Sequence, residues 1–93
     1  MDSNFSGKPG KRESEQEHTQ NVSVLVLHND DVNSFEFVME TLEEVCAHTI
    51  LQAEQCAMIT HYKGKCEVLH GGVGELKLAR KELVARGLSA TIE

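Results

Sequence analysis

Three hydrogen-bonding side chains stand in a row at Asn29, Asp30 and Asp31. They follow an apolar run over residues 22–27 and precede an amphipathic stretch that begins near Ser34. Ionised carboxylates accept hydrogen bonds from ammonium groups, and such charge-assisted bonds are stronger than neutral ones. The triplet therefore suits a ligand that carries a positive or hydrogen-bond-donating end beside an apolar group. A turn with a helix cap is the simpler interpretation of the same three residues.

His61 is the second candidate for ligand binding. It falls near the end of the second expected helix, where an imidazole can also serve a structural role or complement the helix dipole. The surrounding His and Cys residues fit no closed zinc site, because their spacing matches neither a Cys-x2-Cys nor a His-x3–5-His pair. We therefore expect no metal and no other cofactor. The residues considered for a metal site are Cys46, His48, Cys56, His61, Cys66 and His70.

The remaining motifs favour a binding module that is not an enzyme. No nucleophile motif surrounds any of the 3 Cys residues. Gly71-Gly72 lacks the Lys-Ser/Thr that a phosphate-binding loop requires. A small hydrolase with a Cys–His pair stays open as an alternative. The odd number of separated Cys residues indicates reduced thiols in a cytoplasmic protein and not a disulfide framework.

Composition excludes several classes of partner. The net charge of −6, from 15 acidic and 9 basic residues, disfavours nucleic acid because phosphate backbones would be repelled. No apolar run approaches the roughly 20 residues that a membrane span needs. The N-terminal stretch also lacks the apolar segment of a secretory signal. We expect no membrane partner.

Hydrophobic periodicity predicts the elements that position the candidate residues. The run over 22–27 predicts a buried strand. Asn33 and Glu36 predict the N-cap and capping box of a first helix, and Thr49 and Gln52 predict a second capping box. The second helix has apolar residues around a wide arc, which predicts burial on more than one side. Further helices and strands are expected at 50–61 (helix), 66–69 (strand), 73–86 (helix) and 88–92 (strand), with Gly64 in a turn and Gly87 as a helix stop.

The expected order β-α-α-β-α-β describes a compact single α+β domain over residues 22–93. Its most economical form is a three-stranded antiparallel sheet with three helices packed on one face. A doubly wound sheet is not indicated, because no βαβ rhythm with a Gly-rich turn occurs. Residues 1–21 are polar and predict a disordered N-terminal tail. We expect a monomer.

The motifs together resemble the ClpS family, whose members are adaptors that carry N-degron substrates to a Clp AAA+ protease. The resemblance rests on Asn29-Asp30-Asp31, then Glu36-Phe37-Val38, then His61-Tyr62 with Gly64-Lys65. It implies an adaptor that binds the free α-amino group and the bulky apolar first side chain of a substrate. The implied substrates begin with Leu, Phe, Tyr or Trp. The implied partner is the N-terminal domain of a ClpA- or ClpC-type AAA+ ATPase.

The resemblance also implies residue roles. Asn29, Asp30 and His61 would hold the α-ammonium group, and Asp31 would border the pocket and contact the first peptide units. Glu75 and Lys77 would contribute to protease docking. The implied apolar pocket consists of Asn33, Phe35, Val38, Ala57, Thr60 and Leu88.

Several positions depart from the family pattern. Ala57 and Phe35 stand where the family usually has Met, and Thr60 stands for a usual Val. The pocket is thus expected to be opened at Ala57 and filled at Phe35, with an altered ranking of N-terminal residues. Gly72 replaces an acidic docking position. The open alternative is a domain of the same fold that serves another complex, as the C-terminal domain of the ribosomal stalk protein does.

Overall fold

The sheet is built around its first strand. The computed structural model describes residues 22–93; the tail predicted for residues 1–21 lies outside the described residues. Strand β3 (Ser23–His28) pairs antiparallel with β4 (Lys65–Gly71) on one side and with β5 (Ser89–Ile92) on the other, in the order β4-β3-β5. The central place suits β3 because its Leu25, Val26 and Leu27 are all buried.

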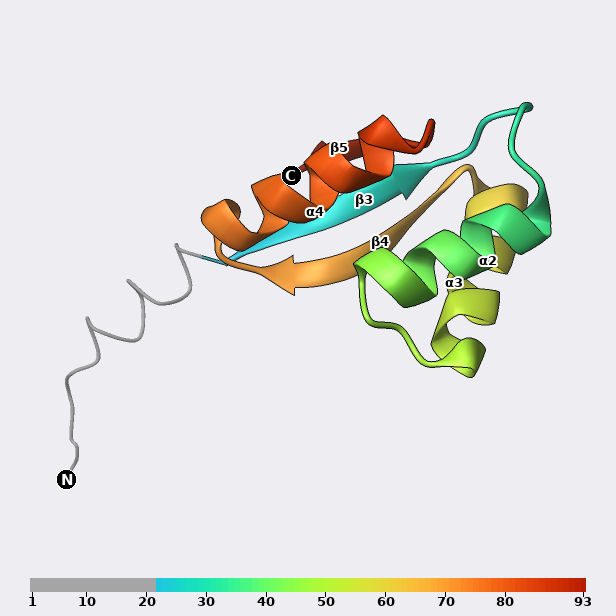
Figure 1. Cartoon of the computed structure of the whole chain (residues 1–93), viewed down its shortest axis with the longest axis horizontal. Helices are drawn as coiled ribbons and strands as arrows, with labels where there is room; N and C mark the ends of the chain where they lie inside the picture. The colour runs from blue at the N-terminus through green and yellow to red at the C-terminus, as the bar shows by residue number, and fades with distance from the viewer. Residues whose placement is uncertain (1–21) are drawn as a thin grey trace, which may run out of the picture.

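Three helices pack on the sheet. They are α2 (Phe35–Val45), α3 (Ile50–Lys63) and α4 (Val73–Ala85). Helix α4 lies along β3 and β5, while α2 and α3 form a hairpin at the β4 side of the sheet (Figure 1). The β-α-α-β-α-β order and the antiparallel three-stranded sheet are confirmed. One aliphatic core joins all six elements through Leu25, Leu27, Leu42, Cys46, Ala53, Val68, Leu76, Leu83, Leu88 and Ala90.

The start of α2 differs from the prediction by one residue. Ser34, not Asn33, is the N-cap: its backbone is extended, and its Oγ accepts a hydrogen bond of 3.0 Å from the Phe37 N–H. The capping box predicted for Asn33 and Glu36 is therefore wrong. Asn33 is not available as a cap because its side chain is hydrogen-bonded to Asp30 and Gly87. The capping box of Thr49 and Gln52 on α3 is confirmed, with both of its bonds present.

Gly87 ends a helix as predicted, and Gly64, which was predicted to lie in a turn, ends another. Gly64 follows α3 with φ 94° and Gly87 follows α4 with φ 92°, a left-handed backbone that glycine adopts without a steric penalty. The predicted two-sided burial of α3 is wrong, because Ile50 and Leu51 are exposed. Helix α3 packs mainly against α2 and β4, and its buried residues are the small Ala53, Ala57 and Thr60, so its outer side faces solvent. Among residues 22–93, no helix is long and apolar enough to cross a membrane.

Candidate functional site

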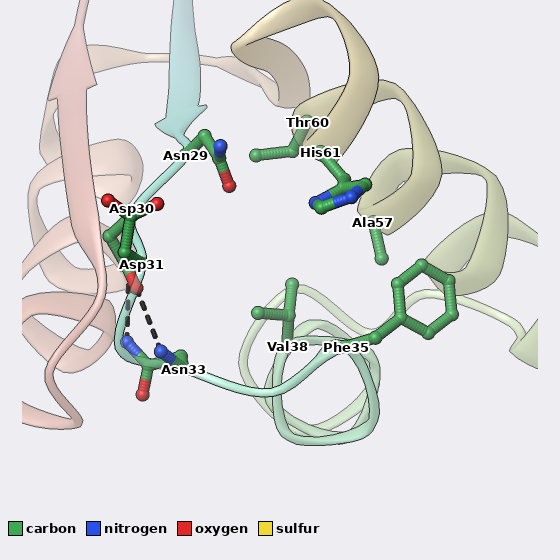
Figure 2. Close-up of a pocket in the computed structure, with 9 residues that line it drawn as sticks. All are labelled: Asn29, Asp30, Asp31, Asn33, Phe35, Val38, Ala57, Thr60 and His61. Atoms are coloured by element: carbon green, nitrogen blue, oxygen red, sulfur yellow. Dashed lines mark hydrogen bonds between the residues drawn. The ribbon is translucent and has the colours of Figure 1, made fainter.

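A cavity of about 310 Å³ lies between the turn that joins β3 to α2 and the inner side of α3. Figure 2 shows side chains from the turn, from α2 and from α3 around one space. These side chains come from separate elements of the chain, and the central strand and the α2–α3 hairpin bring them together. The lining residues are Asn29, Asp30, Asp31, Asn33, Phe35, Val38, Ala57, Thr60 and His61.

The Asp30 carboxylate organises the turn. Its Oδ1 accepts hydrogen bonds from the N–H groups of Val32 (2.8 Å) and Asn33 (2.9 Å), and its Oδ2 accepts one from Nδ2 of Asn33 (3.0 Å). Partial burial alone would raise the pKa of Asp30. The hydrogen bonds from Asn33 and Val32 outweigh that effect and hold the pKa below its ordinary value, because they favour the charged form. Asp30 is therefore an ionised acceptor at neutral pH.

Polar groups at the mouth of the cavity have no partner within the domain. Among residues 22–93, no protein hydrogen bond engages the side chains of Asn29, Asp31 or His61. The amide of Asn29 and the imidazole of His61 face the cavity from opposite sides (Figure 2). All three residues are exposed. Exposed groups of this kind are hydrated in solution, and a ligand with several N–H donors can replace that water.

The inner part of the cavity is apolar. Ala57 and Thr60 are buried on α3, and Phe35 and Val38 of α2 lie opposite them (Figure 2). The Thr60 hydroxyl donates a hydrogen bond of 2.8 Å to the carbonyl oxygen of Cys56, so its hydrogen-bonding capacity is used within α3. The site thus combines acceptors at its mouth with an aliphatic and aromatic interior. This arrangement can hold a cation that carries an apolar side chain.

Nine of the ten residues predicted for the amine site and pocket line this cavity. The tenth, Leu88, is placed instead in the hydrophobic core, where it is 4% exposed. Glu75 and Lys77, predicted for docking, lie exposed near the start of α4, outside this cavity. Glu75 borders a separate shallow groove between α2 and α4, with Glu44, Glu82 and Arg86 among its lining residues.

Two glycine carbonyls also contribute to the site, and no sequence motif predicted this role. The Asn29 N–H donates to the carbonyl oxygen of Gly64 at 2.9 Å, and Asn33 Nδ2 donates to that of Gly87 at 3.0 Å. Both glycines follow helix ends, so they were recognisable as stops but not as anchors for a loop elsewhere in the chain.

Two of the three thiols have raised pKa values. All three Cys residues are free. Burial raises the pKa of Cys46 to about 11, and burial together with the neighbouring Cys56 thiol raises that of Cys66 to about 12. A thiol is a nucleophile only as the thiolate, so these two are unreactive near neutral pH. Residues 22–93 also contain no His, Cys, Asp and Glu group that could hold a metal ion.

Comparison with known proteins places these observations in a family. A family model described as "ATP-dependent Clp protease adaptor protein ClpS" matches residues 18–91. The ATP-dependent Clp protease adapter protein ClpS of Edwardsiella ictaluri is 41% identical over 64 residues, which cover 67% of this chain and 60% of that protein. The proteins of the same name from Erwinia tasmaniensis and Pectobacterium carotovorum are each 36% identical over 64 residues with the same coverage. The matched segment thus spans 60% of the length of these relatives.

A solved structure supports the fold. The structure of Agrobacterium tumefaciens ClpS2 bound to L-phenylalaninamide superposes with a TM-score of 0.69 at 24% sequence identity. The matched region covers 78% of this chain and 95% of the ClpS2 chain. At this identity the likeness concerns the three-dimensional arrangement of the helices and strands alone.

Proposed function

We propose a function from the premise that this chain belongs to the ClpS family of ATP-dependent Clp protease adaptor proteins. It binds the free α-amino group and the bulky apolar first side chain of a substrate protein and delivers that protein to a Clp AAA+ protease. The adaptor has no catalytic step of its own. The observation that carries the proposal is the cavity itself, where hydrogen-bond acceptors surround the mouth and apolar side chains form the interior.

The α-ammonium group would lie at the mouth, held by Asn29, Asp30 and His61. An ammonium group has three N–H donors and no acceptor. The Asn29 amide oxygen, one Asp30 carboxylate oxygen and a neutral imidazole nitrogen of His61 supply three acceptors. Asp31 lies exposed beside them and is suited to receive the first peptide N–H groups of the substrate. Acetylation of the substrate would remove the charge and leave these acceptors unpaired, at a cost on the order of 1–3 kcal/mol per buried group.

The first side chain would enter the apolar interior between Phe35 and Val38 on one side and Ala57 and Thr60 on the other. Full burial of a large apolar side chain contributes about 1.5–3 kcal/mol. Phenylalaninamide, which the Agrobacterium ClpS2 structure contains, combines a free amine with such a side chain. We extend this preference to substrates that begin with Leu, Phe, Tyr or Trp, ranked by the shape that Phe35 and Ala57 give the pocket.

Delivery requires a second surface. We assign it to the start of α4, where Glu75 and Lys77 are exposed and remain accessible when the cavity is filled. The proposed partner is the N-terminal domain of a ClpA- or ClpC-type ATPase. The three free thiols fit a reducing compartment, so we propose that the protein acts in the cytoplasm, as a monomer.

The test is a titration of peptides that differ only in residue one. Peptides that start with Phe, Leu, Trp or Tyr should bind, and those that start with Ala or Ser should bind at least about tenfold more weakly, because they bury less apolar surface. Asn29→Ala and His61→Ala should weaken every binding peptide without changing the fold. Asp30→Ala is a poorer probe, because that carboxylate also holds the turn together. Equal affinity for Phe and Ser peptides would refute the proposal.

A further inference from the structure

The acceptor capacity of Asp30 is largely used within the protein. A carboxylate has about four lone-pair sites. Three are occupied here, two on Oδ1 by the N–H groups of Val32 and Asn33 and one on Oδ2 by the Asn33 amide. One site on Oδ2 remains for a ligand. The group that shares Oδ2 with the ligand is therefore the side chain of Asn33.

The Asn33 amide has no freedom in this arrangement. Its two N–H donors go to Asp30 Oδ2 and to the carbonyl oxygen of Gly87, both at 3.0 Å. Both partners can only accept, so the amide nitrogen must occupy this position and the flipped orientation is excluded. Asn33 thus links the Asp30 carboxylate to a point 54 residues further along the chain.

Gly87 is a firm anchor because the end of α4 is held by two backbone bonds. The Gly87 N–H donates to the carbonyl oxygen of Val84 and the Leu88 N–H to that of Leu83, each at 3.0 Å. This is the pattern of a Schellman motif, in which the residues at its two ends pack together. Leu83 and Leu88 are both buried in the core. The Gly87 carbonyl is therefore fixed relative to the sheet.

The turn that joins β3 to α2 is held at its other end by the C-terminal end of α3. The Asn29 N–H donates to the carbonyl oxygen of Gly64, whose own N–H donates to that of Thr60, both at 2.9 Å. Gly64 ends the helix that carries His61. The turn is thus hydrogen-bonded to the ends of two helices. Asn29 binds Gly64 at the end of α3, and the side chain of Asn33 binds Gly87 at the end of α4.

We propose that Asn33 is a positioning residue of the amine site, which sets the orientation of Asp30 for the substrate ammonium group by tying Oδ2 to the Gly87 carbonyl. This inference rests on the proposed function. It assigns Asn33 a role through Asp30 and not through contact with the substrate side chain. Loss of the amide would remove the hydrogen bond that holds Oδ2, leaving the carboxylate held through Oδ1 alone, and would release the turn from α4.

Other charges near Asp30 must be considered in a test that uses pH. Asp31 and His61 line the same cavity, and α2 contributes no titratable side chain to it. Arg86, which precedes Gly87, pairs with Glu44 and Glu82. These groups are unchanged in a variant at position 33. A shift in the titration of Asp30 can therefore be assigned to the lost amide.

The experiment compares Asn33→Ala with Ser34→Ala in the full chain. Ser34→Ala removes the N-cap bond of α2 and serves as the matched control for lost stability, because Ser34 does not line the cavity. The Asp30 carboxyl is followed by NMR during an acid titration, and the affinity for a free Phe-initiated peptide is measured at pH 7. Asn33→Ala should raise the pKa of Asp30 and weaken peptide binding about tenfold, the scale of one lost charged hydrogen bond. Ser34→Ala should lower the melting temperature. It should leave the pKa of Asp30 unchanged and the affinity for the peptide within about twofold of wild type.

The outcomes separate this inference from the proposed function. An unchanged Asp30 titration in Asn33→Ala overturns the positioning role, whatever the peptide does. A shifted titration with unchanged peptide affinity also overturns it. Failure of the wild-type protein to prefer the Phe-initiated peptide overturns the proposed function, and the role in ligand binding falls with it. If Asn33→Ala does not fold, Asn33→Asp keeps the side-chain shape, removes both donors and should shift the pKa of Asp30 further upward.

Discussion

The backbone N–H of Asn29 donates a hydrogen bond of 2.9 Å to the carbonyl oxygen of Gly64. This bond joins the residue that follows β3 to the residue that ends α3. It brings the acceptor side chains of the turn opposite the His61 imidazole, three residues before Gly64. The left-handed backbone of Gly64 is what directs its carbonyl toward the turn.

Gly64→Ala should therefore affect both stability and binding. A Cβ at this position would meet no atom within 4 Å, so the cost comes from the φ of 94° alone, about 1–2 kcal/mol. For a domain of this size, that loss lowers the melting temperature by several degrees. Gly74→Ala is the matched control: the same addition also meets no atom, but Gly74 lies inside α4 and lacks a positive φ. It should be neutral or stabilising, and equal losses in both variants would contradict the assigned role of Gly64.

The pocket departures predict a coupled effect of Phe35 and Ala57. Because Phe35 lies across the cavity from Ala57, Ala57→Met should crowd the interior and weaken Trp- and Phe-initiated peptides more than Leu-initiated ones. The double variant with Phe35→Met should recover part of the loss. Calorimetry of the wild type, the two single variants and the double variant gives the coupling energy between positions 35 and 57 for peptide binding. Additive effects of the two changes would show that the two side chains do not share one pocket.

The lowered pKa of Asp30 makes a prediction about stability. A carboxyl whose pKa is lowered by folding stabilises the native state above the pKa of the unfolded chain, and that contribution is lost as the pH falls through the lower, folded value. The urea midpoint should therefore change little through Asp30 between pH 7 and about pH 5 and decline below about pH 4. Asp30→Asn should show a smaller decline in that acid range, and an identical decline would count against the hydrogen bonds described for the turn.

Cys46 and Cys66 should be inert in the folded protein. Because the pKa values of Cys46 and Cys66 are raised to about 11 and about 12, iodoacetamide at neutral pH should label both slowly, and labelling should become fast in urea. Mass spectrometry of the digested protein measures each site. Rapid labelling of either residue in the native state would revive the hydrolase alternative.

Much of the fold could be predicted because its determinants are local. The β-branched run before Asn29, the capping box at Thr49 and the glycine stops at 64 and 87 all lie within a few residues of the feature they specify. The start of α2 could not be predicted to the residue. Asn33 and Ser34 are both good caps, and a hydrogen bond to Gly87, 54 residues away, decides between them.

The site was predictable to a similar degree. Residue types and the family motif identified the nine residues that line the cavity, since a motif preserves which positions face a ligand. Leu88 was predicted to line the pocket, but its side chain is buried in the hydrophobic core together with Leu83. The exposed outer side of α3 was also missed, because an apolar residue does not by itself show whether another element covers it.

The most direct test of the proposed function measures one peptide with and without an N-terminal acetyl group. Isothermal calorimetry at pH 7 should detect binding of the free Phe-initiated peptide and a loss of at least about a hundredfold for the acetylated form. Acetylation removes the positive charge and two of the three N–H donors from which Asn29, Asp30 and His61 would accept hydrogen bonds. Similar affinities for the two forms would contradict the account, since the cavity would then be recognising an apolar side chain without the amine.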